Sequence, residues 1–138
     1  MGSIKGSGQG AYLFDTHTLL WAAHDESKLS ARALSVIEDS NTHIFVSAVS
    51  AYEIMYKYKL GKLPAYDYVA KYYFDILQEL GTDALPINKY HAHFAGAIEW
   101  SHRDPFDRLL AAQATTDQLI LITNDSVFDE LTNITTLW

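Results

Sequence analysis

The chain has 138 residues, 49% of them hydrophobic, and this size and composition predict one globular domain with a single continuous core. It contains no cysteine, which excludes disulfides, thiolate metal sites and cysteine nucleophiles, and which suits a reducing cytoplasm. The formal charge of −7 argues against binding nucleic acid mainly by bulk electrostatics, and no apolar run is long enough to span a membrane.

The first ten residues are polar and rich in glycine. We interpret residues 1–10 as a leader or disordered segment and residues 11–138 as the folded domain. Short β-like runs alternate there with longer helical ones, which is typical of a parallel α/β sheet. The predicted strands are residues 12–14, 43–46, 85–87, 119–123 and 134–137. The first and fourth are almost wholly apolar, as expected of central strands covered on both faces.

Helical spacing of apolar residues predicts helices between these strands. The predicted helices are residues 30–39, 51–60, 65–80, 91–100 and 105–117. Their boundaries carry recognisable signals: Ser30 is a good N-cap, Gly61 and Gly81 follow two helix ends, and Pro105 stands in a first turn. A further helix after the first strand would be capped by Asp15.

Four acids follow, or end, short apolar runs: Asp15, Glu53, Asp107 and Asp125. In a parallel sheet the carboxyl ends of all strands lie at one edge, so these acids are expected to converge there. Two carboxylates 4 Å apart repel by about 4 kcal/mol at an effective dielectric near 20. Helix dipoles offset only ~0.3–1 kcal/mol of this. A divalent cation resolves the conflict, and an all-oxygen ligand set favours Mg²⁺ or Mn²⁺.

Each acid also has a purely structural explanation. The explanations are a cap by Asp15, a capping box from Ser50 to Glu53, a cap by Asp104 with Asp107 in the first turn, and a short terminal helix begun by Asp125. Capping and metal binding are compatible, because a cap turns its carboxylate toward the loop edge. Together the four acids favour a metal-dependent phosphodiesterase.

Four blocks of sequence follow one another along the chain. They are Leu13-Phe-Asp15-Thr-His-Thr-Leu-Leu-Trp21, Val46-Ser-Ala-Val-Ser-Ala-Tyr-Glu53-Ile, His102-Arg-Asp-Pro-Phe-Asp107-Arg-Leu-Leu-Ala-Ala-Gln-Ala and Leu121-Ile-Thr-Asn-Asp125. In this order they resemble the PIN-domain ribonucleases, most of all the VapC toxins of bacterial toxin–antitoxin pairs. The resemblance runs from about residue 11 to the C-terminus, and the third block is the most distinctive.

The resemblance implies a PIN-like three-layer α/β sandwich, with about five parallel strands flanked by helices. It also implies a Mg²⁺- or Mn²⁺-dependent endoribonuclease that acts on RNA as a cytoplasmic toxin, forms a homodimer and is neutralised by a cognate antitoxin. Asp15, Glu53 and Asp107 match the acidic metal-binding triad, and Asp125 matches a less constant fourth acid. Residues expected to support these ligands are Ser47, Ser50, Asp104 and Thr123.

Several further residues are candidates for contact with RNA or protein. His17, His102, Arg103 and Arg108 stand beside the acids as possible RNA contacts, although a turn hydrogen bond is the better interpretation of each histidine. Lys57, Lys59 and Lys62 are candidates for holding an RNA backbone, with surface solvation slightly favoured. Side chains that would build a dimer or antitoxin groove, or else fill the core, are Tyr52, Met55, Tyr56, Tyr66, Tyr68, Tyr72 and Tyr73.

Clustered acids also suggest two other interpretations, of which the first remains open from the sequence. One keeps the fold without the enzyme, as a binding module whose acidic pocket accepts an arginine from a partner chain. The other is a response-regulator-like phosphoacceptor, which requires adjacent acids after the first strand and a late lysine, and the sequence has neither.

Overall fold

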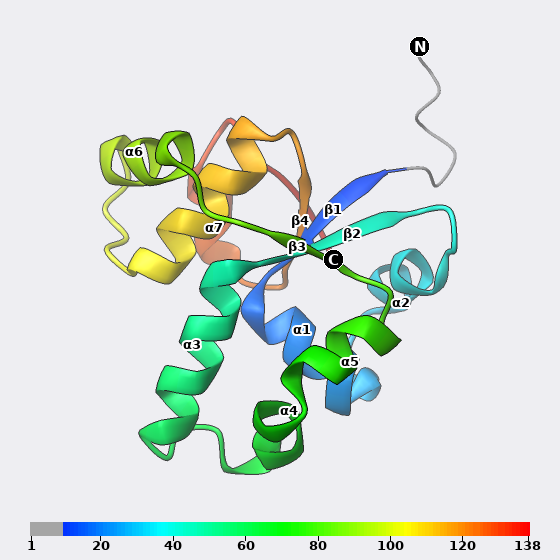
Figure 1. Ribbon diagram of the computed structural model, residues 1–138. Coiled ribbons are helices and arrows are strands. Elements are labelled where there is room, and N and C mark those ends of the chain that lie inside the picture. The colour runs from blue at the N-terminus through cyan, green and yellow to red at the C-terminus, as the bar shows by residue number, and fades with distance from the viewer. Residues whose placement is uncertain (1–9) are drawn as a thin grey trace.

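A computed structural model describes residues 10–138, so nearly all of the predicted leader lies outside the described residues. The described part contains one five-stranded sheet in the order β3-β2-β1-β4-β5, and every neighbouring pair is parallel (Figure 1). The strands are β1 Ala11–Phe14, β2 His43–Ser47, β3 Asp83–Leu85, β4 Ile120–Ile122 and β5 Thr135–Leu137. The prediction of a parallel α/β sheet is confirmed.

Alternate residues of β1 face two separate hydrophobic cores, as the two-residue period of a strand requires. Tyr12 and Phe14 pack in one core with helices that follow β1 and β2. Leu13 packs in the other core, against Leu110 and Phe128. The sheet is therefore the middle layer of a three-layer sandwich, and β1, which is covered on both faces, is its central strand as predicted.

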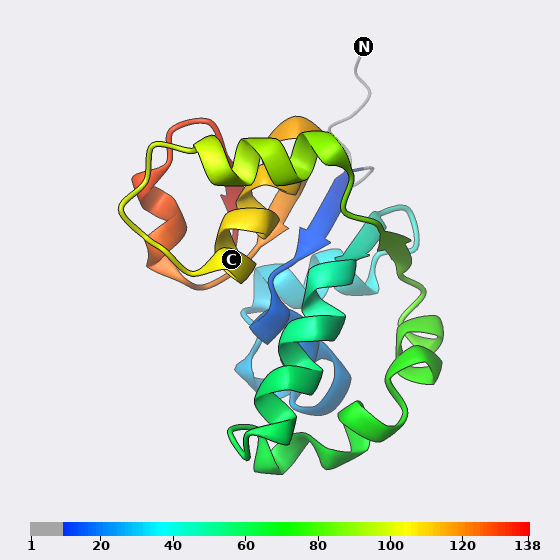
Figure 2. The ribbon, with the colours of Figure 1, turned by 60° about the vertical axis from the view of Figure 1, so that its left-hand side comes forward.

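The two outer layers are unequal in size, and the figures show them on opposite sides of the sheet (Figures 1 and 2). One layer holds α1 Thr16–His24, η1 Glu26–Lys28, α2 Ala31–Glu38, η2 Pro64–Tyr66, α4 Asp67–Lys71 and α5 Tyr73–Glu79. The other holds α6 Lys89–Ala97, α7 Pro105–Thr116 and η3 Ser126–Glu130. Helix α3, Ala48–Lys59, joins them, because Val49 packs in one core and Ile54 in the other.

The predicted elements differ from the structure mainly at three places, one of which is the helix predicted at residues 51–60, which begins three residues earlier as α3. The third strand lies two residues earlier than predicted, and it ends just before Pro86, which has no N–H to donate to a ladder. The predicted helix at residues 65–80 is divided into η2, α4 and α5, with a break at Tyr72. Val69 and Ile76 on either side of the break are both buried in one core, so the apolar spacing does not reveal it.

Among the residues that the structure describes, none of the helices has the length and apolar character needed to cross a membrane.

Candidate metal centre

Asp15 is the first residue beyond the central strand, and it is buried and oriented by its neighbours. It caps α1, as predicted, with Oδ1 accepting from the Thr16 N–H at 2.7 Å. Its Oδ2 accepts from the Thr123 hydroxyl at 2.7 Å. Burial raises the pKa of Asp15, while these hydrogen bonds and the charge of His17 lower it in part and the charge of Glu53 raises it further. Thr123 thus holds one carboxylate oxygen of Asp15 in place.

Glu53 projects from the second turn of α3 and is 4% exposed. Its Oε2 accepts from Lys57 Nζ at 2.6 Å. Its Oε1 is buried and has no hydrogen-bond partner among residues 10–138. A buried carboxylate oxygen without a partner is unusual, and it is available to a cation.

The predicted capping box from Ser50 to Glu53 is wrong, because α3 begins at Ala48, one turn earlier than the box requires. Ser47 is the N-cap, and its Oγ accepts from the Val49 N–H at 3.0 Å. Ser50 lies inside the helix, fully buried, and its hydroxyl contacts that of Thr16 at 2.9 Å. The early start places Glu53 well inside α3, away from the helix N-terminus.

Asp107 lies in the first turn of α7, next to the residues that start that helix. Asp104 is the N-cap, as predicted, and its Oδ1 accepts from the Phe106 N–H at 2.8 Å. Asp107 Oδ2 lies 2.7 Å from His102 Nε2. His102, Asp104 and Asp107 each offer a ligand atom, and these atoms lie within 4.8 Å of one another.

The pKa of Asp107 is shifted by burial and by the charges of neighbouring acids. The pKa of Asp107 is raised to about 6, mainly by burial, and the hydrogen bond with His102 offsets part of the rise. The carboxylates of Asp104, Asp15 and Glu53 make smaller contributions that also raise it. The charges of Asp15 and Glu53 therefore reach Asp107, although the described acids and histidines whose ligand atoms lie within 4.8 Å of one another are His102, Asp104 and Asp107.

Asp125 lies at the rim of this group. Its Oδ1 accepts from the Val127 N–H at 3.0 Å, so it begins η3, the predicted short terminal helix. Its own N–H donates to the Thr123 hydroxyl at 3.0 Å, which connects it to Asp15 through one side chain. A pocket of about 380 Å³ lies beside the two acids. Its lining is Asp15, His17, Thr18, Trp21, Asn124, Asp125 and Ser126.

Of the residues predicted to contact RNA, His17 and Arg103 are exposed, whereas the Arg108 guanidinium is hydrogen-bonded within the protein. His17 is exposed at the pocket, with its ring centroid 5.9 Å from that of Trp21, and Arg103 is exposed on the loop before α7. The structure gives Arg108 another role. Its guanidinium donates four hydrogen bonds of 2.7–3.0 Å to the backbone carbonyls of Ala95, Ile98, Trp100 and His102.

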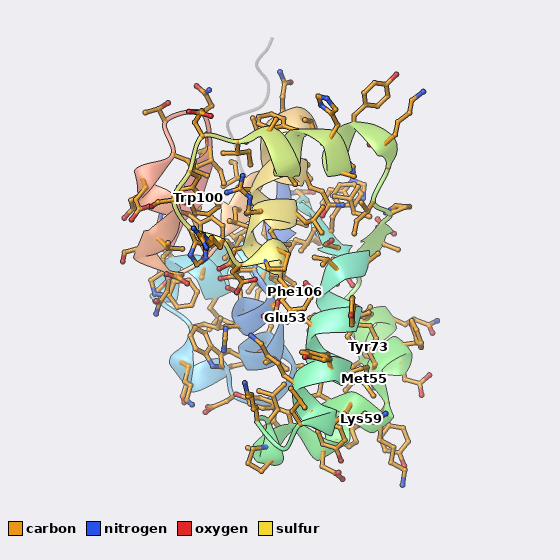
Figure 3. All side chains as sticks on the ribbon, turned by 90° about the vertical axis from the view of Figure 1, so that its left-hand side faces the viewer. Glu53, Met55, Lys59, Tyr73, Trp100 and Phe106 are labelled. Carbon is orange, nitrogen blue, oxygen red and sulfur yellow. The ribbon has the colours of Figure 1, made fainter. Side chains whose placement is uncertain are left out.

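Lys57 lies at the site in contact with Glu53, a position that was not predicted from the sequence. Its Nζ contacts Glu53 and lies 5.9 Å from the centre of the Phe106 ring. Figure 3 shows Glu53 and Phe106 close together where α3 approaches α7. Burial alone lowers the pKa of Lys57, but the hydrogen bond and charge of Glu53, with the charges of Asp104 and Asp107, raise it above 10.5 overall. The i, i+4 spacing to Glu53 was the available signal.

These residues fit a divalent metal ion. The donors are carboxylate oxygens, the ligand type of Mg²⁺ and Mn²⁺. Glu53 Oε1 is buried without a partner among the described residues. Besides burial, the negative charges of Asp104, Asp15 and Glu53 raise the pKa of Asp107. A cation among them would satisfy the oxygen and remove the repulsion.

The sequence matches the PIN domain family over residues 12–134, nearly all of the described chain. The chain belongs to the PIN-domain family. This PIN domain is 37% identical over 76 residues to Ribonuclease VapC16 of Mycobacterium tuberculosis. That alignment covers 52% of this chain and 52% of VapC16, so it spans about half the length of the curated relative. The resemblance to VapC proteins seen in the motifs is confirmed.

Solved structures share the fold of this PIN domain. One is a chain of VapBC2 from Rickettsia felis bound to a DNA fragment from its promoter, with 15% identity, a TM-score of 0.68 and coverage of 92% of this chain and 97% of that one. Another is a chain of DNA-bound VapBC from Salmonella typhimurium, with 15% identity and a TM-score of 0.67. The match covers 93% of this chain and 97% of that one. A third, from a Klebsiella pneumoniae toxin–antitoxin complex, has 20% identity and a TM-score of 0.63. The match covers 91% of this chain and 96% of that one.

Proposed function

We propose that this PIN domain is a Mg²⁺- or Mn²⁺-dependent endoribonuclease that hydrolyses RNA phosphodiester bonds. The observation that carries the proposal is the placement of Asp15, Glu53 and Asp107, from three elements, near enough for the charges of Asp15 and Glu53 to act on Asp107, whose pKa is raised to about 6 mainly by burial. The partial similarity to a protein named as a ribonuclease supports the same reaction class.

In this proposal Asp15, Glu53 and Asp107 hold the ion, with Asp125 as a fourth acid at the rim. When bound, the ion would supply Lewis-acid stabilisation of the negative charge that develops on the phosphate. The surrounding residues keep the ligands in place before the ion arrives. Thr123 and the Thr16 N–H fix both oxygens of Asp15, and His102 fixes one oxygen of Asp107.

The pocket beside Asp15 and Asp125 is the proposed site for a nucleotide next to the scissile phosphate. Its aromatic wall is formed by Trp21 and His17, and stacking on such rings accepts any base. Asn124 and Ser126 line the same pocket and offer hydrogen bonds to a base edge. Because the chain carries a net charge of −7, RNA binding depends on stacking and on the ion more than on a basic surface.

The proposal includes two protein partners, a cognate antitoxin and a second copy of the chain. The supporting feature is an aromatic surface on α3, α4 and α5, whose members are Tyr52, Met55, Tyr56, Tyr68, Tyr72 and Phe74, each 42–78% exposed. A hollow of about 410 Å³ with Met55, Tyr72 and Phe74 in its lining joins these helices. Exposed Tyr, Phe and Met of this kind are enriched at protein interfaces.

The test is cleavage of RNA by the purified chain. We expect Asp15→Asn and Asp107→Asn each to lower the cleavage rate at least ~100-fold with an unchanged circular dichroism spectrum, because each removes a charge that the ion requires. EDTA should abolish wild-type cleavage, and added Mg²⁺ or Mn²⁺ should restore it. The matched control is Asp75→Asn, an exposed acid on α5, which should cleave at the wild-type rate. Undiminished cleavage by Asp15→Asn in EDTA would refute the proposal.

A further inference from the structure

Lys57 is placed inside the acid cluster. Its side chain is 30% exposed, against 5% for the side chain of Glu53 that it contacts. The hydrogen bond of 2.6 Å between Lys57 Nζ and Glu53 Oε2 is short, as expected when both groups are charged. The negative charges of Asp104 and Asp107 act on the same ammonium group.

The ammonium group of Lys57 also lies over the aromatic ring of Phe106. Its Nζ lies 5.9 Å from the centre of the Phe106 ring, at the start of α7. Lys57 belongs to α3, whereas Asp104, Phe106 and Asp107 stand at the beginning of α7. The lysine therefore places a positive charge between the elements that carry two of the three proposed ligands.

We infer that Lys57 is the resident counter-ion of the metal centre, a positioning residue that holds Glu53 before the divalent ion binds and releases Glu53 Oε2 when the ion arrives. This inference rests on the proposed function, because it requires that the three acids bind an ion.

The reason is competition for one carboxylate. A buried Glu53 without an opposite charge is strongly unfavourable, and Lys57 supplies that charge in the metal-free chain. A divalent ion among the acids supplies twice the charge and needs the carboxylate oxygens as ligands. Lys57 and the ion therefore stabilise the same negative charge, and each weakens the attraction of the site for the other.

The experiment measures Mn²⁺ binding by isothermal titration calorimetry to the full chain. In Lys57→Met the positive charge is lost while an unbranched side chain is kept on the helix. We expect its Kd for Mn²⁺ to fall about tenfold, which corresponds to the loss of about one unfavourable charge interaction near the site. Lys59→Met is the matched control, because it makes the same change on the same helix at an exposed position. Its Kd should stay within about twofold of wild type, since an exposed charge outside the cluster is screened.

Thermal unfolding provides a second readout that separates this role from a merely structural one. In EDTA we expect Lys57→Met to melt at a lower temperature than wild type, because Glu53 loses its counter-ion. Saturating Mn²⁺ should raise the melting temperature of Lys57→Met by more than it raises that of wild type, by mass action. If Lys57→Met is poorly folded without metal, the same two measurements are made on Lys57→Gln, which keeps a hydrogen-bond donor.

The outcomes distinguish this inference from the proposed function. Mn²⁺ binding to Lys57→Met that is equal to or weaker than wild-type binding overturns the role of Lys57 and leaves the metal centre intact. Absence of Mn²⁺ binding in wild type and in both Lys57 variants overturns the metal centre itself, and the role of Lys57 with it.

Discussion

Asp107 shows how burial and neighbouring charge set the behaviour of a single side chain. Its pKa is raised from 3.8 to about 6, mainly by burial and then by the carboxylates of Asp104, Asp15 and Glu53. Between these two pH values the folded chain binds more protons at Asp107 than the unfolded chain does. The free energy of unfolding of the metal-free protein should therefore fall as pH rises from about 4 to about 6.

This contribution is tested by urea unfolding in EDTA at pH 4 to 8, on wild type and on Asp107→Asn. The free energy of unfolding of Asp107→Asn should fall less than that of wild type between about pH 4 and about pH 6. At pH 7 the variant should be the more stable protein, because it never carries the buried charge. Equal slopes for the two proteins would mean that the charge of Asp107 does not govern this part of the pH dependence. With saturating Mn²⁺, wild type should be more stable than Asp107→Asn at pH 7, since the ion requires the charged carboxylate.

Trp21 is the residue that tests the proposed nucleotide pocket. In Trp21→Leu the apolar contact with Trp138 is partly kept but the stacking surface is lost. Stacking of a base on an aromatic ring contributes about 1–3 kcal/mol, so we expect the KM for a short RNA to rise about tenfold or more. Tyr90→Ala, an exposed aromatic on α6, is the control. An unchanged KM in Trp21→Leu would place the RNA elsewhere.

The sequence predicted the acids of the site better than the groups around them. Asp15 follows β1 and Glu53 lies on the helix after β2, and a parallel sheet brings such positions to one edge, whereas Asp107 was indicated by its sequence block. Lys57 was one of three lysines considered for RNA contact, and its i, i+4 spacing from Glu53 places it on the same face of α3, where it forms an ion pair with that acid. Trp21 gave no signal that separates a pocket wall from a core side chain.

At the scale of elements, Arg108 joins two helices and the loop between them. Its four hydrogen bonds reach Ala95 and Ile98 at the end of α6, and Trp100 and His102 in the loop before α7. A cation at a helix C-terminus also interacts favourably with the last carbonyls. Arg108 thus holds in place the segment that carries His102, the partner of Asp107.

Arg108→Lys should destabilise the fold, because an ammonium group cannot reproduce the planar donors of the guanidinium. We expect a loss of about 2 kcal/mol in the free energy of unfolding, measured with urea, in line with hydrogen bonds to charged groups. RNA cleavage should also slow, since the loop that orients Asp107 is loosened. Arg103→Lys, at an exposed position of the same loop, should change stability by less than ~0.5 kcal/mol. Equal stability of the two variants would contradict this role.

Hydrophobic periodicity did not predict the end of the third strand or the break between α4 and α5. The third strand was expected to include Pro86, but pairing with β2 covers Asp83–Leu85 and ends before the proline. The break at Tyr72 is invisible in the sequence, because Val69 and Ile76 keep helical spacing across it. The elements that position the site were predicted in kind, although the helix that carries Glu53 begins three residues earlier than predicted.

At the scale of the whole molecule, the strand order explains why distant acids meet. β1 lies between β2 and β4, so the residues that follow these three strands stand side by side at one edge of the sheet. Asp15 follows β1, α3 with Glu53 follows β2, and Thr123 follows β4. Asp107 comes from the opposite layer, at the start of α7. The parallel sheet was predictable from the alternation of elements, whereas the meeting of α7 with α3 depends on packing between side chains.

The most direct test is to locate Mn²⁺ in crystals of the chain by anomalous scattering. We expect a peak within coordination distance of carboxylate oxygens of Asp15, Glu53 and Asp107 together. A peak confined to His102, Asp104 and Asp107, or no peak near these acids at saturating Mn²⁺, would contradict it.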